Sequence, residues 1–134
     1  METEAEVIEE LRAKAQHIAD FLTERKGMDT AVVDVTGRCN WADFFVITTV
    51  NSVGHLRGLV HDLWEEIDSL ALTVRNRHKA PGIDGWELID CGQIIIHLMS
   101  AELRGFYSLE KLWSGPVPAD AEIIPDAPDG TDPE

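Results

Sequence analysis

Apolar residues recur at steps of three and four along the first 25 positions, the spacing of one face of an α-helix. Acidic residues fill the first turns, and Arg25 and Lys26 stand just before Gly27, so the charges suit the helix dipole and the glycine suits a helix end. The pattern predicts an amphipathic helix over 3–25, with an apolar stripe of Val7, Ile8, Leu11, Ala15, Ile18, Phe21 and Leu22.

Two runs rich in β-branched and aromatic residues follow, at 30–35 and 43–50, and each predicts a strand. The second run is nearly continuous in apolar and threonine residues, which is typical of a central strand covered on both faces. We therefore expect helices on both sides of the sheet, or helices on one side and a partner on the other.

A second helix is predicted after Asn51 and Ser52, which can cap it. Gly54 and Gly58 lie inside its pattern without the spacing of a phosphate-binding loop, so they are interpreted as packing positions. A third strand is predicted at 72–75, before a loop that contains Pro81, Gly82 and Gly85. The apolar stripe of this second helix consists of Leu56, Leu59, Val60, Leu63, Ile67 and Leu70.

The remaining elements are an antiparallel strand pair at 86–89 and 93–99, joined by a turn at 90–92, and a short helix capped by Ser100. The whole order predicts an α/β fold, a mixed β-sheet with helices packed on it, in a single domain over residues 1–115. Residues 116–134 are acidic and rich in proline, and we expect a disordered tail there. The apolar and aromatic positions of the last helix are Leu103, Phe106, Tyr107, Leu109, Leu112 and Trp113.

The charge of the chain limits its partners. Twenty-five acidic residues against eleven Lys and Arg give a net charge of −14, a field that repels nucleic acid and anionic lipid. Little or no direct nucleic-acid binding and no membrane binding are expected, and a basic protein is the favoured partner. The N-terminus is acidic, unlike a targeting signal, and two cysteines are too few to stabilise a domain of this size by disulfide bonds. Both features favour a cytoplasmic location.

Sites for catalysis or metal binding are hard to find in the sequence. Cys39 and Cys91 lack a histidine and a carboxylate at any known nucleophile spacing, so structural thiols are favoured. His61 and Glu65 lie four apart on the second helix, but two ligands are too few for a closed metal site, and solvated helix residues are the simpler interpretation. We expect no metal and no cofactor.

Three carboxylates, Asp34, Asp43 and Asp90, stand at strand edges, where a metal-dependent nucleotidyltransferase-like enzyme would carry its ligands. Such an enzyme would also have a Gly-Ser turn before its helix and an Asp-x-Asp pair, and the chain has neither, so this function is the alternative. By strand alternation His97 points away from Ile96 and Leu98, where it can bond a carboxylate such as Asp90. A structural histidine near an interface is favoured over a general base.

The segment at 104–113 alternates polar heads with large apolar groups. Arg, Tyr and Trp dominate binding hot spots, and a helix that only closes the core explains Leu109 and Leu112 better than Tyr107 or Trp113. For the aromatic residues we favour an interaction surface.

The string Trp-Glu-Leu-Ile-Asp-Cys-Gly at 86–92, the Ile-Ile-Ile-His run at 94–97 and Arg-Gly-Phe-Tyr-Ser-Leu-Glu-Lys-Leu-Trp at 104–113 together resemble the ribosomal silencing factor family, also called Iojap. The segment 43–47, with Asn51, Ser52 and His55, is similar to the first motif of the same family. The chain departs from the family pattern at Cys91 and Gln93, around the turn, and at Val50, where a glycine is usual.

The resemblance implies a non-catalytic factor with a nucleotidyltransferase-like α/β fold. It also implies that the chain binds the large ribosomal subunit through ribosomal protein fourteen and blocks joining of the small subunit, repressing translation, for example under nutrient limitation. A homodimer is expected when the protein is free. The expected partner-binding residues are Trp86, Asp90, His97, Arg104, Tyr107, Leu109, Glu110 and Trp113.

Overall fold

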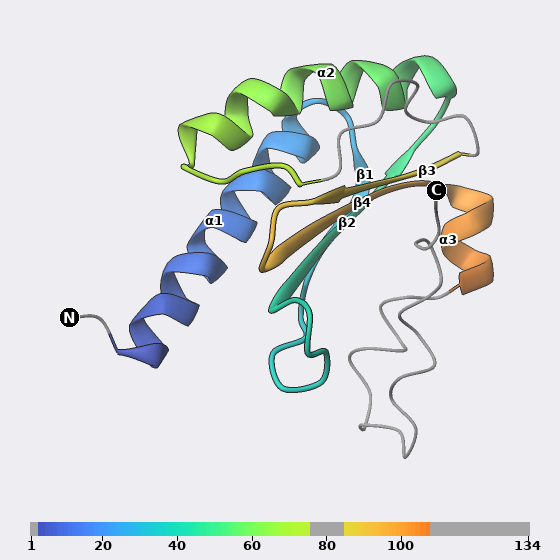
Figure 1. Ribbon diagram of the computed structural model, residues 1–134. Helices are drawn as coiled ribbons and strands as arrows, with labels where there is room; N and C mark the ends of the chain where they lie inside the picture. The colour runs from blue at the N-terminus through green and yellow to red at the C-terminus, as the bar shows by residue number, and fades with distance from the viewer. Residues whose placement is uncertain (1–2, 76–84, 108–134) are drawn as a thin grey trace.

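A computed structural model describes residues 3–75 and 85–107 (Figure 1). The four strands form one mixed sheet in the order β1-β2-β4-β3, which confirms the predicted α/β class. The elements in chain order are α1 (Glu4–Glu24), β1 (Met28–Asp34), β2 (Phe44–Val50), α2 (Val53–Ser69), β3 (Trp86–Asp90), β4 (Ile94–Ser100) and α3 (Ala101–Tyr107).

The centre of the sheet is the parallel pair of β2 and β4, which runs in unbroken register from Phe44 opposite Ile94 to Val50 opposite Ser100. β1 and β3 flank this pair and are antiparallel to their neighbours. Every residue of β2 is buried, so the prediction of a central strand covered on both faces is confirmed.

Strand alternation divides the core into two layers. On the side that we call the helical face, α1 and α2 cover the even-numbered residues of β2 and β4. On the other side, the histidine face, α3 lies across the sheet from α1 (Figure 1). Its Leu103 packs against the odd-numbered residues. Helices therefore cover both faces, as expected. The histidine face consists of Val33, Phe45, Ile47, Trp86, Leu88, Ile95, His97 and Met99.

The predicted helix starts agree with the structure. Thr3 and Glu6 form a reciprocal capping box at the start of α1. The Ser52 hydroxyl accepts a hydrogen bond from the His55 backbone N–H at 2.9 Å, and the Ser100 hydroxyl accepts one from the Leu103 backbone N–H at 3.2 Å. Both serines are thus helix caps, as predicted.

The strand predicted at 72–75 is wrong, because this segment has no ladder in the structure. Leu72 and Val74 alternate with exposed residues since both pack against the core of the helical face after a turn at Ala71, where φ is 61°. One backbone bond reaches the sheet, from the Arg75 N–H to the Asp90 carbonyl at 2.7 Å. The alternation thus reflects burial under α2.

Several predictions fall on residues outside the described ranges. They concern the loop with Pro81 and Gly82, the part of the last helix with Leu109, Leu112 and Trp113, and the tail at 116–134.

The outer strand β1 is irregular at its start. Its register with β2 shifts between Met28 and Ala31, and Asp29 between them has a positive φ of 50°. This is a β-bulge, which twists a strand edge and interrupts its row of bonding groups.

Gly27, between α1 and β1, lies where the backbone comes very close to its neighbours. A Cβ added there would stand 2.4 Å from the Thr48 Oγ1 and 2.9 Å from the Leu22 carbonyl oxygen, which already accepts the Gly27 N–H. Because one of these contacts is with backbone, the position is reserved for glycine by space.

We expect Gly27→Ala to lower the free energy of unfolding by about 1–3 kcal/mol, the usual cost of overpacking. Urea denaturation followed by circular dichroism measures it. If Gly27→Ala unfolded with the same free energy as the wild type, the backbone would not need the close approach at Gly27.

Gly58 offers the matched control. It is exposed within α2, and a Cβ there would meet nothing within 4 Å, so the interpretation of Gly58 as a packing position is wrong. Gly58→Ala should raise the free energy of unfolding by about 0.5–1 kcal/mol, because alanine loses less backbone entropy in a helix.

Candidate partner-binding site

The histidine face carries a hydrogen bond between two ring side chains. The Trp86 Nε1–H, at the start of edge strand β3, donates to the His97 Nδ1 of central strand β4 at 3.2 Å, and the ring centroids are 6.0 Å apart. His97 does point away from Ile96 and Leu98, as predicted.

The expected bond from His97 to Asp90 is wrong. Asp90 stands opposite Ile95, at the far end of β3 from Trp86. Its Oδ1 accepts the Gly92 backbone N–H at 2.9 Å, where Gly92 has a φ of 88°. Asp90 therefore helps to shape the turn between β3 and β4.

His97 is held neutral inside the sheet. Only 2% of it is exposed, and its ring meets Phe45 edge-on, with centroids 4.8 Å apart. Burial lowers the pKa of His97 to about 3. Since Nδ1 accepts the indole proton, the neutral ring carries its own proton on Nε2. Among the residues that the structure describes, that buried Nε2 has no hydrogen-bond partner.

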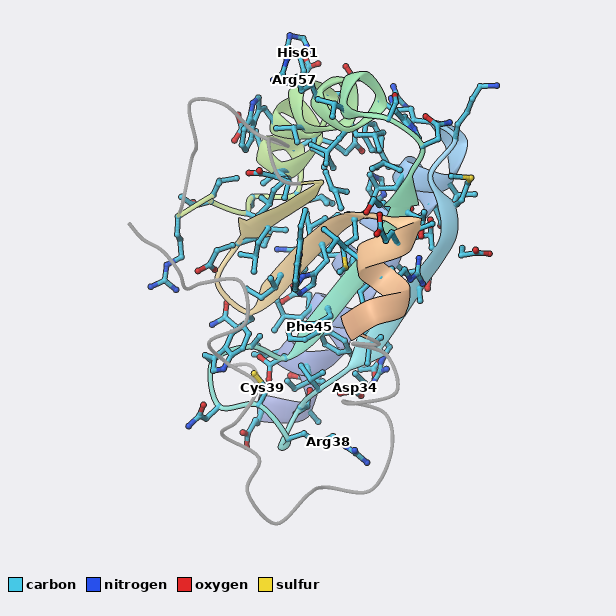
Figure 2. All side chains as sticks on the ribbon, turned by 90° about the vertical axis from the view of Figure 1, so that its right-hand side faces the viewer. Asp34, Arg38, Cys39, Phe45, Arg57 and His61 are labelled. Carbon is cyan, nitrogen blue, oxygen red and sulfur yellow. The ribbon has the colours of Figure 1, made fainter. Side chains whose placement is uncertain are left out.

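The ring contacts extend along the face to Trp41, which the sequence analysis did not single out. Trp41 lies in the connection between β1 and β2, is 37% exposed, and has its ring centroid 5.7 Å from that of Phe45. We call Trp41, Phe45, His97 and Trp86 the aromatic row. Figure 2, which looks onto this side, places Phe45 near the connection that carries Arg38 and Cys39.

Arg104, another expected site residue, connects α3 to the sheet. Its Nη1 donates to the Thr49 Oγ1 at 2.9 Å and is 3.4 Å from the Met28 carbonyl oxygen. This contact fixes α3 beside the ends of β1 and β2. The side chain of Tyr107 and residues Leu109, Glu110 and Trp113 lie outside the described part of the chain.

The structure does not bring Asp34, Asp43 and Asp90 together as a metal site. Asp34 accepts bonds from the Thr36 N–H at 3.0 Å and the Arg12 guanidinium at 3.3 Å. Partial burial raises its pKa, and these bonds outweigh that effect, so the pKa lies below its ordinary value. Within residues 3–75 and 85–107, no three His, Cys, Asp or Glu side chains are placed to hold a metal ion.

A cleft of about 380 Å³ opens where the parallel strands β2 and β4 end, beside the first turn of α2. In α/β sheets ligands often bind at this edge. The described lining is mostly apolar, from Met28, Val50, Val53 and Leu56, and includes no titratable side chain. Nearby His55 is engaged at both nitrogens, with the Asn51 N–H at 3.2 Å and the Arg25 carbonyl oxygen at 3.1 Å.

The remaining candidates for chemistry occupy structural or solvated positions. Cys39 and Cys91 are buried, unpaired thiols, and burial raises the pKa of both, that of Cys91 to about 12. His61 has an 86% exposed side chain, and Glu65 is exposed as well. Figure 2 shows His61 projecting from α2 at the end of the molecule away from Phe45. These interpretations from the sequence agree with the structure.

The buried, neutral state of His97 generates a pH prediction. Above its ordinary pKa of 6.5, His97 is neutral in both the folded and the unfolded chain, so its protonation does not lower the free energy of unfolding. As the pH falls toward 3, the unfolded chain binds a proton that the folded chain refuses, so stability is lost. Relative to His97→Phe, the wild type should lose up to about 1.4 kcal/mol per pH unit between about pH 6 and pH 4.

Urea unfolding of both proteins across this range tests it, because other titrating groups cancel in the difference. A constant difference between the two proteins would contradict the buried, neutral assignment.

None of the helices in the described ranges is both long and apolar enough to cross a bilayer.

The sequence of this chain is similar to those of several known proteins. Residues 8–133 match the family described as "Ribosomal silencing factor during starvation". The chain is 39% identical over 101 residues to the ribosomal silencing factor RsfS of Treponema pallidum, covering 74% of this chain and 88% of that protein. It is 33% identical over 99 residues to the mouse protein "Mitochondrial assembly of ribosomal large subunit protein 1", covering 72% of this chain and 43% of that protein.

A crystal structure of a Chromobacterium violaceum protein shares the fold, with a TM-score of 0.67 and 21% identity over 84% of this chain and 90% of that one. With a profile match over nearly the whole chain and a relative 39% identical, this chain belongs to the ribosomal silencing factor family.

Proposed function

We propose that this chain binds the large ribosomal subunit through ribosomal protein fourteen and, by occupying that surface, blocks joining of the small subunit and represses translation. Membership of the ribosomal silencing factor family is the single observation that carries the proposal. The printed name of the mouse relative also refers to the ribosomal large subunit.

The accessible tryptophans at the border of the histidine face form the part of the surface best suited to hold the partner. Trp86 is only half-buried there, and Trp41 is more exposed at the other end of the aromatic row. Aromatic side chains held in fixed positions supply much of the energy of protein interfaces at a low entropic cost. Of the proposed contact residues, Trp86 is the apolar anchor, while Asp90 and Arg104 fix the turn and the helix on either side of it.

The net charge of −14 supports a protein surface as the partner. Ribosomal RNA repels such a chain, whereas a basic ribosomal protein attracts it, so charge favours one kind of surface on the same particle. The selection is electrostatic, and the binding energy comes from packed apolar groups.

The alternative, a metal-dependent nucleotidyltransferase-like enzyme, has weaker support. Asp34 is bonded to Arg12 on the helical face, and Asp90 is bonded within a turn on the opposite side. Calorimetry with a nucleotide and Mg²⁺ would favour the enzyme if it detected binding.

Trp86→Ala should weaken binding to isolated large subunits by about 2 kcal/mol or more, the range of an interface hot spot, which is roughly a 30-fold rise in Kd. Co-sedimentation of the titrated protein with large subunits measures it, with circular dichroism to verify folding.

His61→Ala is the matched control, because its exposed side chain projects from α2, on the other side of the sheet. It should bind as the wild type does. Equal affinities for Trp86→Ala and His61→Ala would place the interface elsewhere.

The proposed mechanism predicts that the protein competes with the small subunit for the large subunit and that no nucleotide is consumed. When the protein is titrated into separated subunits, light scattering should report fewer joined ribosomes, in proportion to the occupancy of the large subunit. Excess small subunits should relieve the effect, as competing equilibria require. Full joining at concentrations that saturate the large subunit would rule out exclusion, and inhibition that needs nucleotide hydrolysis would favour the enzyme.

A further inference from the structure

The bond between Trp86 and His97 does not have the properties of a contact kept for stability. His97 fills a site bounded by Phe45 and Trp86, two aromatic rings, in the middle of an apolar layer. A phenylalanine of similar shape would fill the same space. The histidine instead places a buried N–H at Nε2 that has no acceptor within residues 3–75 and 85–107, and an unpaired buried N–H costs free energy.

The geometry explains what the histidine provides in return. Trp86 begins an edge strand and is half-buried, with part of its side chain packed against the histidine face. His97 belongs to a central strand, and its Nδ1 receives the indole N–H at 3.2 Å. The bond therefore connects a half-exposed side chain at the edge of the sheet to a buried side chain of a central strand.

The protonation state keeps this acceptor available. Because burial holds the pKa of His97 near 3, Nδ1 keeps its lone pair throughout the pH range of a living cell. A lysine or a charged histidine could not accept the indole proton.

We propose that His97 is a positioning residue for partner binding: it fixes the orientation of the Trp86 indole, at a cost to stability, so that the indole is presented in its binding conformation. This inference rests on the proposed function, because it takes Trp86 as an anchor for a protein partner on the large ribosomal subunit. Its structural half is measurable without any ribosome.

The test uses three variants of the full chain. His97→Phe removes the acceptor and keeps the ring volume, His97→Asn retains an acceptor near the position of Nδ1, and Trp86→Phe removes the donor. The indole N–H resonance, assigned by its loss in Trp86→Phe, and its hydrogen exchange report the bond in the free protein. Co-sedimentation with purified large subunits reports affinity.

In His97→Phe we expect the indole N–H resonance to move and to exchange at least tenfold faster, while the melting temperature stays equal or rises. Affinity for large subunits should fall about tenfold. His97→Asn should restore much of the exchange protection and most of the affinity. A purely structural histidine would not give this pattern, since stability and binding would fall together.

If His97→Phe does not fold, Trp86→Phe and the double variant that combines it with His97→Asn keep the proposal falsifiable. Trp86→Phe and the double variant should bind equally weakly, because a bond already lost cannot be lost twice. Unchanged indole exchange in His97→Phe, or equal binding by the wild type and Trp86→Phe, would overturn the inference. If wild-type protein fails to bind large subunits while indole exchange responds as expected, the proposed function is wrong and the positioning of Trp86 stands.

Discussion

The rest of the fold depends on the parallel pairing of β2 with β4. Seven successive residue pairs join these strands, and both strands carry bulky apolar side chains on both faces. Parallel neighbours require a long crossover connection, which here contains α2 and β3. Two apolar faces in turn require two covering layers, and α1 with α2 on one side and α3 on the other provide them.

The two layers differ in what they contribute. The helical face is an apolar core in which the long helices bury their stripes, and its requirements are those of packing. The histidine face holds a buried titratable ring and Trp86 in one layer, and Trp41 contacts the Phe45 ring of that layer from the connection between β1 and β2. A purely apolar residue at position 97 would leave no buried polar group unpaired, so the difference between the faces supports the proposal that the histidine face carries the function.

Most of the fold could be predicted from the sequence, because the signals were local. The stripe of α1, the continuous apolar run of β2 and the serine caps each depend on neighbours in the chain. The prediction of a strand at 72–75 was wrong, because alternation of apolar and polar residues indicates burial and does not indicate hydrogen bonding to a neighbouring strand. The predicted hydrogen-bond partner of His97 was wrong for a related reason. Alternation gave the correct face of the sheet, but whether Asp90 or Trp86 lies next to His97 depends on the register between β3 and β4. Trp41 carried no periodic signal, and the three-dimensional contact with Phe45 was needed to find it.

The irregular start of β1 bears on how copies of this protein can meet. A regular outer strand offers a row of N–H and C=O groups to which a second chain can add its own strand, and this is a common route to aggregation. The shift between Met28 and Ala31, with Asp29 at a positive φ, breaks that row near one end of the strand. At the opposite edge, the carbonyl of Asp90 is already occupied by the Arg75 N–H. Strand addition from a second molecule is therefore interrupted at these two points, the start of β1 and the end of β3.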